Sequence, residues 1–172
     1  MQHLNRSKGF PPIARSDARV LILGSLPGVR SIEAAEYYAH PRNAFWSIMA
    51  ALTGTLGEYG QRCDSLMSSG IAVWDVLASS VRPGSLDANI DLDSAEVNDF
   101  AVFLREHPEI KRICFNGQKA AQIFRQHVLP TLTDPDLDLR TLPSTSPAHA
   151  SMTSEAKLLH WRNGLADLVG GK

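Results

Sequence analysis

Residues 19–31 read RVLILGSLPGVRS, an apolar run followed directly by a turn rich in glycine and proline. Residues 20–23 contain no polar side chain and mix β-branched residues with leucine. Strands that are buried on both faces have this composition, and they lie at the centre of parallel sheets. The stretch therefore predicts a central strand over residues 19–25.

Three further runs predict strands, and helical patterns separate them. The strand candidates are residues 71–77, 111–115 and the weaker 137–142. Helices are expected at residues 31–38, 43–52, 58–69, 94–107, 118–129 and 155–168. Strands alternating with helices predict an α/β fold in which helices cover both faces of a mostly parallel sheet.

The segments outside this pattern set the expected organisation of the chain. Residues 1–18 are polar and contain proline, so we expect an N-terminal arm lying on one domain that spans residues 19–172. Residues 82–92 are rich in turn-forming side chains and predict a loop.

The composition is that of an ordinary globular protein, with 172 residues, 44% hydrophobic and 20% charged. No apolar run is long enough to cross a membrane, and the N-terminus lacks the apolar core of a signal peptide, so we expect a cytoplasmic protein. Two cysteines exclude a disulfide scaffold and a four-cysteine zinc or iron–sulfur site. We expect no metal and no cofactor.

The charges are nearly balanced overall but unevenly distributed. Seventeen Lys and Arg against 18 Asp and Glu give a net charge of −1, which alone is weak evidence against a nucleic-acid partner. Residues 1–50 carry six basic and three acidic side chains, whereas residues 75–109 carry eight acidic and two basic ones. One anion-binding face, or two solvated surfaces, would both fit this pattern.

Polar or turn-forming residues follow each predicted strand, at residues 24–30, 74–78, 116–117 and 143–150. Ligands of open α/β sheets bind beyond the carboxyl ends of the strands. Because parallel strands end at the same edge, the four segments are expected to form a single site.

Several side chains in these segments have both a structural and a functional interpretation. Asn43 can donate and accept hydrogen bonds, but Asn before an apolar helix is also a common N-cap. Asp75 is a lone carboxylate in an apolar run and either caps a turn or acts chemically. The turn at residues 24–31 is neither a Walker loop nor GxGxxG, and the chain has no Gly-x-Ser-x-Gly elbow.

Three segments in order, GSLPG, YAHPRNAFW and LPSTSPA, resemble the spaced signature of the uracil-DNA glycosylase superfamily. The second segment is similar to the mismatch-specific uracil/thymine glycosylases. The Ser-rich third segment and the stretch WDVL…GSLDANI are more similar to the hypoxanthine-DNA glycosylase branch. The resemblance implies a three-layer α/β/α sandwich with a short central parallel sheet. It also implies removal of a damaged base that is flipped out of DNA.

The resemblance assigns roles to individual residues. Asn43 matches the catalytic residue that holds the attacking water, because Leu26 stands where other relatives place an Asp or Asn; Asp75 is the second candidate for this task. Ser144 stands near a position where relatives often carry His or Asn. The implied base-binding residues are Gly24, Ser25, Leu26, Pro27, Tyr38 and Asn116. The implied DNA-binding residues are Arg30, Arg42, Ser144, Thr145, Ser146, Pro147, Ala148 and His149.

The resulting functional hypothesis is a monofunctional glycosylase that excises hypoxanthine from DNA containing a damaged or mismatched base, and we expect it to act as a monomer. No lysine is placed as a Schiff-base nucleophile, so strand cleavage is not expected. A uracil or mismatch-specific thymine glycosylase is the first alternative. A catalytically inactive module that binds DNA damage is the alternative of another class, and Leu26 is the residue that supports it.

Overall fold

The computed structural model describes residues 6–133 and 136–168 and contains a four-stranded parallel sheet of order β3-β2-β6-β7. Its strands are β2 (Val20–Gly24), β3 (Ile71–Asp75), β6 (Arg112–Asn116) and β7 (Asp138–Leu142). All three pairings within this sheet are parallel. The four predicted strands are confirmed, with β2 in the interior of the sheet as its apolar run indicated.

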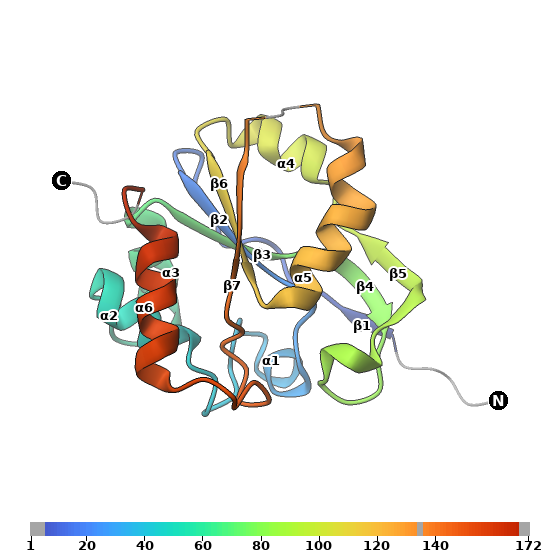
Figure 1. Ribbon diagram of the computed structural model, residues 1–172, viewed down its shortest axis with the longest axis horizontal. Helices are drawn as coiled ribbons and strands as arrows, with labels where there is room; N and C mark the ends of the chain where they lie inside the picture. Colours follow the sequence, from blue (N-terminus) through green and yellow to red (C-terminus); the bar gives the residue numbers. More distant parts are fainter. Residues whose placement is uncertain (1–5, 134–135, 169–172) are drawn as a thin grey trace.

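Helices cover both faces of this sheet (Figure 1). Alternate residues of β2 point to opposite faces: Val20 and Ile22 pack in one apolar cluster, Leu21 and Leu23 in the other. The first cluster includes α2 (Phe45–Thr53), α3 (Tyr59–Ser68) and α6 (Ser154–Leu165). The second includes α4 (Phe100–Glu106) and α5 (Gln118–Ile123). The predicted three-layer α/β/α sandwich is confirmed.

A second sheet, which the sequence did not predict, joins the beginning of the described chain to its middle. Its strands are β1 (Arg6–Lys8), β4 (Leu77–Val81) and β5 (Asp91–Val97), in the antiparallel order β1-β4-β5. The run predicted as one strand over residues 71–77 therefore divides at Val76. A short 3₁₀ turn, Asp87–Asn89, lies within the predicted loop between β4 and β5.

The helix predicted over residues 94–107 is wrong in its first part. Residues 94–97 belong to β5, where the Ser94 hydroxyl accepts a hydrogen bond from Val81 N at 2.9 Å. The helix begins only at Phe100, because the side chain of Asp99 accepts from Val102 N and caps it. The apolar residues of the stretch 94–107 recur at helical spacing throughout. Its first four residues nevertheless form a strand, which antiparallel pairing with β4 stabilises.

The other helices differ from prediction mainly at their ends. The helices predicted at residues 43–52, 58–69 and 155–168 are confirmed as α2, α3 and α6. Helix α1 (Val29–Ala34) ends before residue 38 because Ala35 adopts a left-handed conformation with φ of 54°. The helix predicted at 118–129 is α5 followed by a π-helical turn, Phe124–Val128, and a 3₁₀ turn, Leu129–Thr131. No helix of the described residues is long and apolar enough to span a membrane.

The described part of the N-terminal segment packs against both sheets. Strand β1 pairs with β4, and Ile13 forms an isolated bridge with Val73 of β3. The carbonyl of Phe10 accepts a hydrogen bond from the Trp74 indole at 3.1 Å. Residues 1–5 of the predicted arm, and residues 134–135 and 169–172 of the predicted domain, lie outside the described residues.

The buried guanidinium of Arg112 joins the end of α6 to the sheet. It donates to the carbonyls of Gly164 and Ala166, at 3.0 and 2.7 Å, and to the Asp138 carboxylate at 2.8 Å. Arg140 binds the same carboxylate but is about one third exposed, with 38% of its side-chain area accessible.

We therefore expect Arg112→Met to lower the free energy of unfolding by about 2 to 3 kcal/mol, because buried carbonyls lose their donors. The matched variant Arg140→Met should lose about 1 kcal/mol or less, since solvent screens its ion pair. Urea denaturation followed by circular dichroism measures both. Equal losses in the two variants would contradict this account of α6 anchoring.

Candidate active site

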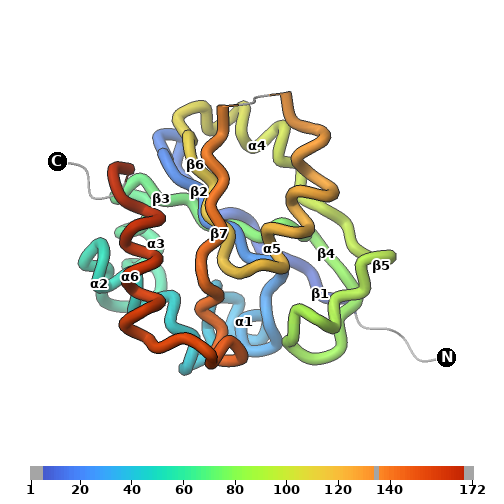
Figure 2. The backbone as a smooth tube through the Cα atoms, in the orientation of Figure 1, coloured from blue at the N-terminus to red at the C-terminus, as the bar shows by residue number. Residues whose placement is uncertain are grey.

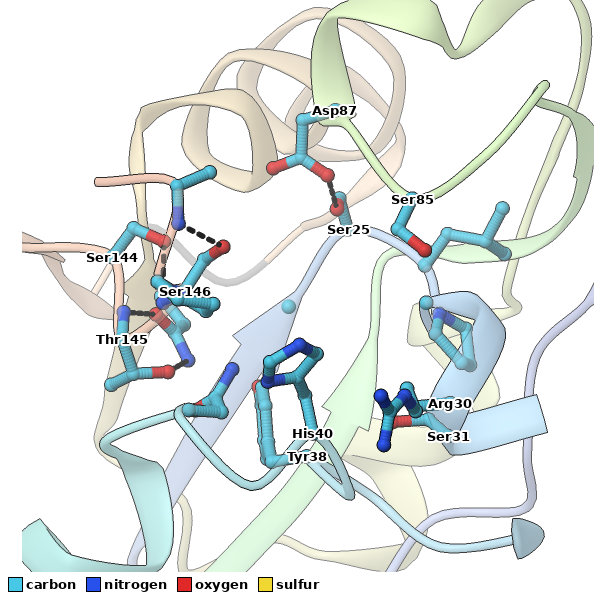
Figure 3. Close-up of a pocket in the computed structure, with 18 of the residues that line it drawn as sticks. Ser25, Arg30, Ser31, Tyr38, His40, Ser85, Asp87, Ser144, Thr145 and Ser146 are labelled. Atoms are coloured by element: carbon cyan, nitrogen blue, oxygen red, sulfur yellow. Dashed lines mark hydrogen bonds between the residues drawn. The ribbon is translucent and has the colours of Figure 1, made fainter. Parts of the chain in front are cut away.

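A cavity of about 430 Å³ lies at the carboxyl ends of the parallel strands (Figure 3). Its walls are formed by the loop that follows β2, the loop before α2, the β4–β5 connection and the loop that follows β7. Every residue for which the sequence predicted a site role lines this cavity, except Arg42. The lining members of that set are Gly24, Ser25, Leu26, Pro27, Arg30, Tyr38, Asn43, Asn116, Ser144, Thr145, Ser146, Pro147, Ala148 and His149.

Three residues form the floor of the cavity. Gly24 and Asp75 end neighbouring strands and are paired in register, so they lie side by side. A Cβ atom on Gly24 would lie 2.6 Å from Asp75 Oδ1 and 3.0 Å from the Tyr38 hydroxyl. Only glycine therefore allows the carboxyl group and the phenol to approach the strand end this closely.

Tyr38 is held in an unusual conformation beside this floor. Its φ is 54°, which a non-glycine residue rarely adopts, and such strain is frequent at functional sites. Its ring stacks on Phe45 with centroids 4.1 Å apart and an interplanar angle of 28°. The hydroxyl is enclosed without a hydrogen-bond partner, and burial raises the pKa of this phenol, which is therefore neutral at physiological pH.

Among the acidic side chains that line the cavity, Asp75 has the most strongly shifted pKa. It is 3% exposed, and its Oδ2 atom is buried without a hydrogen-bond partner. Burial is the main cause that raises the pKa of Asp75 to about 7, and repulsion by Asp87 adds to it; Arg82 acts in the opposite direction. The carboxyl group is thus poised to change protonation near neutral pH.

Asn43 has the structural role that its sequence context allowed, and it also lines the cavity. Its Oδ1 accepts a hydrogen bond from Phe45 N at 2.9 Å, so the side chain stabilises the start of α2 although the N-cap position itself is Ala44. Its Nδ2 group donates to no described residue, and Asn43 lines the cavity. The amide oxygen therefore has a structural partner, whereas the amide nitrogen has none among the described residues.

Asn116 was predicted to bind the base, but both ends of its side-chain amide already form hydrogen bonds within the protein. Its Nδ2 donates to Thr145 Oγ1 at 2.9 Å, and its Oδ1 accepts from Thr145 N at 2.9 Å. This reciprocal pair is buried and ties the end of β6 to the loop that follows β7. Next to it, Gly117 has φ of 96°, and a Cβ there would lie 3.2 Å from Ser144 Cβ.

The loop that follows β7 is anchored at several points along its length. The Trp161 indole donates to the carbonyl of Pro143 at 2.9 Å, and the Lys157 ammonium donates to the carbonyl of His149 at 2.7 Å. Thr145 accepts from Ala44 N at 3.0 Å. As the trace in Figure 2 shows, this connection between β7 and α6 passes the end of the sheet where α1 lies. The loop is therefore pre-formed before any ligand binds.

The β4–β5 connection forms a wall that sequence reasoning missed. The Ser25 hydroxyl donates to Asp87 Oδ1 at 2.6 Å, and Val29 N donates to Ser85 Oγ at 2.9 Å. The buried Arg82 guanidinium donates to the carbonyls of Leu26 and Pro27. The turn-rich composition of residues 82–92, directly after a strand, was the available signal.

The two arginines predicted to bind DNA lie at different places. Arg30 lines the cavity, on α1. Arg42 lies instead in a neighbouring depression, with Trp46 and Arg62. There the Arg62 guanidinium lies 4.5 Å from the centroid of the Trp46 ring. Both predicted arginines are exposed.

The sequence model described as "Uracil DNA glycosylase superfamily" matches residues 11–168, nearly the whole chain and all the segments that form the cavity. The chain belongs to the uracil DNA glycosylase superfamily. Membership agrees with the predicted resemblance, which rested on three of these segments.

Within this superfamily the chain is similar to two curated archaeal proteins named hypoxanthine DNA glycosylase. The one from Methanosarcina barkeri is 35% identical over 120 residues, covering 68% of this chain and 75% of the relative. The one from Methanosarcina acetivorans is 34% identical over 145 residues, covering 83% and 87%.

A solved structure from the same superfamily has a similar fold. It is the solution NMR structure of a Methanosarcina acetivorans protein assigned provisionally as a uracil DNA glycosylase, and the TM-score is 0.75. The identity is 30%, and the superposition covers 92% of this chain and 98% of the other. Among the described residues of this superfamily member, no three His, Cys, Asp or Glu side chains cluster so that they could hold a metal ion.

The raised pKa of Asp75 predicts how the stability of this superfamily member depends on pH. The folded state binds the proton more tightly than the unfolded state, so Asp75 weakens folding progressively from its unfolded pKa near 4 up to about 7. Asp75→Asn should therefore raise the melting temperature at pH 8 by more than at pH 4. Calorimetry at both pH values measures this difference.

The control for this prediction is Asp93→Asn, because Asp93 is an exposed carboxylate in β5. Its melting temperature should follow that of the wild-type protein at both pH values. A stabilisation by Asp75→Asn that does not change with pH would contradict the assignment of a neutral carboxyl group to the folded state.

Proposed function

We propose that this chain is a monofunctional DNA glycosylase that excises hypoxanthine from deoxyinosine in base excision repair. The observation that carries the proposal is its 34–35% identity to two relatives named hypoxanthine DNA glycosylase, over 68% and 83% of this chain. The cavity volume of about 430 Å³ falls within the range of about 300 to 1,000 Å³ that is usual for small-ligand sites. The expected products are free hypoxanthine and an abasic site.

The base must leave the duplex to reach this cavity, and Tyr38 is proposed to receive it. One face of the Tyr38 ring is packed on Phe45, and the residue lines the cavity. A planar base can stack favourably on this ring, because the packing on Phe45 already holds the ring in place. The segment Gly24, Ser25, Leu26 and Pro27 is proposed to contact the base edge; Pro27 has no backbone N–H, so any donor comes from the other three residues.

Hydrolysis needs a water beneath the sugar, and Asn43 is proposed to hold it. The unengaged Nδ2 and the second lone pair of Oδ1 remain for this task. Leu26 has no polar group for it. Asn116 is proposed to act near the base chiefly by positioning Thr145, since both ends of its amide are engaged.

The loop that follows β7 is proposed to enter the space that the flipped base leaves. The Ser144 hydroxyl accepts from Ser146 N, and the Ser146 hydroxyl accepts from Ala148 N, so both hydroxyl protons remain for phosphate oxygens. We expect the enzyme to act as a cytoplasmic monomer without a metal or other cofactor.

A uracil or mismatch-specific activity is the second candidate, because the superfamily and the solved relative carry the uracil DNA glycosylase name. The decisive assay uses duplexes with one inosine, one uracil or one mismatched thymine, followed by alkali to cleave abasic sites. Faster cleavage at inosine supports the proposal, and faster cleavage at uracil or thymine would replace it. Tight binding without cleavage of any duplex would assign an inactive damage-binding module.

Asn43→Ser separates the capping role of this residue from its catalytic role. Serine can also accept from Phe45 N, so the melting temperature should stay near that of the wild-type protein; loss of a cap costs only about 1 kcal/mol. Single-turnover release of hypoxanthine should fall about a hundredfold or more, because the amide geometry is lost. Binding of inosine-containing DNA should persist.

The control is Asn163→Ser, an exposed position on α6 outside the cavity, which should keep both stability and rate. Near-normal excision by a folded Asn43→Ser protein would overturn the assignment. It would then leave Asp75 as the candidate for positioning the water.

Binding to DNA should weaken steeply with salt although the net charge is −1. Each neutralised phosphate of a duplex contributes about 0.9 to the slope of log affinity against log salt. Arg30→Ala should lower that slope by about one unit, and Arg105→Ala should not change it, since Arg105 lies on α4 at the other end of the sheet (Figure 1). Fluorescence anisotropy measures the slopes. Salt-insensitive binding would argue against a DNA substrate.

A further inference from the structure

Asp75 is a buried carboxyl group that the roles proposed above do not use. It lies on the cavity floor at the end of β3, and its Oδ1 approaches Gly24 so closely that a Cβ atom there would lie 2.6 Å away. Its Oδ2 is enclosed, and no described residue donates a hydrogen bond to the carboxyl group. An ionised carboxylate without donors is costly to bury, so the site favours the protonated acid.

The charged groups around Asp75 do not reverse this preference. Arg82 is the cation that favours ionisation, but its Nη1 and Nη2 already donate to the carbonyls of Leu26 and Pro27. From the β4–β5 connection, Asp87 repels a second negative charge. Together with burial, this raises the pKa of Asp75 to about 7.

The other titratable groups that line the cavity are phenols, imidazoles and the exposed guanidinium of Arg30. The hydroxyl of Tyr37 donates to the carbonyl of Pro11 at 2.9 Å, and that of Tyr38 has no partner. His40 and His149 also line the cavity but are half-buried rather than enclosed. The carboxyl proton is thus the acidic proton at the floor itself.

Cleavage of the glycosidic bond places negative charge on the departing base, and a proton or a strong donor must stabilise it. By the resemblance, Ser144 stands near a position where relatives often carry His or Asn. Its hydroxyl accepts from Ser146 N at 3.2 Å and offers only a neutral donor. The site therefore needs another group for the leaving base.

We propose that Asp75 is the general acid that protonates the departing purine at N7, an inference that rests on the proposed glycosylase function. As the C1′–N9 bond breaks, its electron pair moves into the purine while the Asp75 proton passes to N7. Neutral hypoxanthine then leaves. Water adds to C1′, and its proton goes to solvent, from which the Asp75 carboxylate is protonated again. The net reaction is hydrolysis with no further reactant.

A proton donor in this position would also favour purines over uracil. The N7 atom belongs to the five-membered ring that carries the glycosidic bond, so a proton there directly neutralises the charge of the leaving group. Uracil has no corresponding ring nitrogen. The acid would thus contribute to the choice of substrate as well as to the rate.

The test is the pH dependence of single-turnover excision from an inosine-containing duplex between pH 5.5 and 9. The wild-type rate constant should be level at low pH and fall about tenfold per pH unit above the pKa of the acid, because only the protonated form acts. Asp75→Asn keeps the size of the side chain but cannot supply this proton. It should be about a hundredfold or more slower, with no such fall.

Two further measurements separate acid catalysis from a binding or folding role. Asp75→Asn should bind a duplex containing a cleavage-resistant 2′-fluoro-deoxyinosine with nearly wild-type affinity, as expected for a contact made in the transition state. Asp87→Asn should move the fall in rate of the otherwise wild-type enzyme to lower pH, because it removes the repulsion that raises the pKa of Asp75.

Each outcome decides the inference. A wild-type rate that stays level to pH 9, or an Asp75→Asn rate near that of the wild type, would overturn it while the proposed function stands. A slow Asp75→Asn enzyme that keeps the fall in rate would assign the acid to another group, such as His40 or His149. An equal loss of affinity and rate would make Asp75 a binding residue. If the wild-type protein releases no hypoxanthine at any pH, the proposed function itself fails.

Discussion

Gly24 and Asp75 form the last pair in the parallel ladder between β2 and β3, and the geometry of the cavity depends on this pairing. Hydrogen bonds from Val76 N to Gly24 O and from Leu77 N to Ser25 O extend the pairing beyond the strand ends. They fix where the loop after β2 leaves the sheet. A shift by one residue would turn the carboxyl group to the opposite face of the sheet, because side chains alternate along a strand.

The walls of the cavity are fastened both to neighbouring elements and to one another. The loop after β7 is tied to β6 through Asn116 and to α6 through Trp161 and Lys157. The loop after β2 is tied to the β4–β5 connection through Arg82 and Asp87. Donors that are already oriented need no rearrangement during the reaction, which is how an enclosed site stabilises developing charge.

The same region contains the features that are least favourable for folding. Tyr38 has a left-handed backbone conformation, and its hydroxyl and the Asp75 Oδ2 atom are buried without partners. Natural proteins tolerate such features chiefly where function requires them. Their concentration around Gly24 supports the candidate site on physical criteria that do not depend on the comparison with relatives.

Local patterns were sufficient for the parallel sheet and for most of its helices. The unbroken apolar character of residues 20–23 reflects burial on both faces, and polar segments after each strand must meet at one edge when strands are parallel. The antiparallel sheet was not predictable in the same way. Residues 94–97 have apolar spacing compatible with a helix, and only pairing with β4 makes them a strand.

The sequence by itself determined the fold class, the superfamily and the segments that surround the cavity apart from the β4–β5 connection, because short motifs and hydrophobic periodicity are local properties. It left open whether Asn43 is structural or chemical; the structure shows its Oδ1 accepting from Phe45 N and the residue lining the cavity. It also could not reveal that Asn116 is engaged with Thr145 or that Asp75 lacks a donor. Burial and hydrogen-bond partners arise from contacts between distant segments, and those contacts exist only in the folded chain.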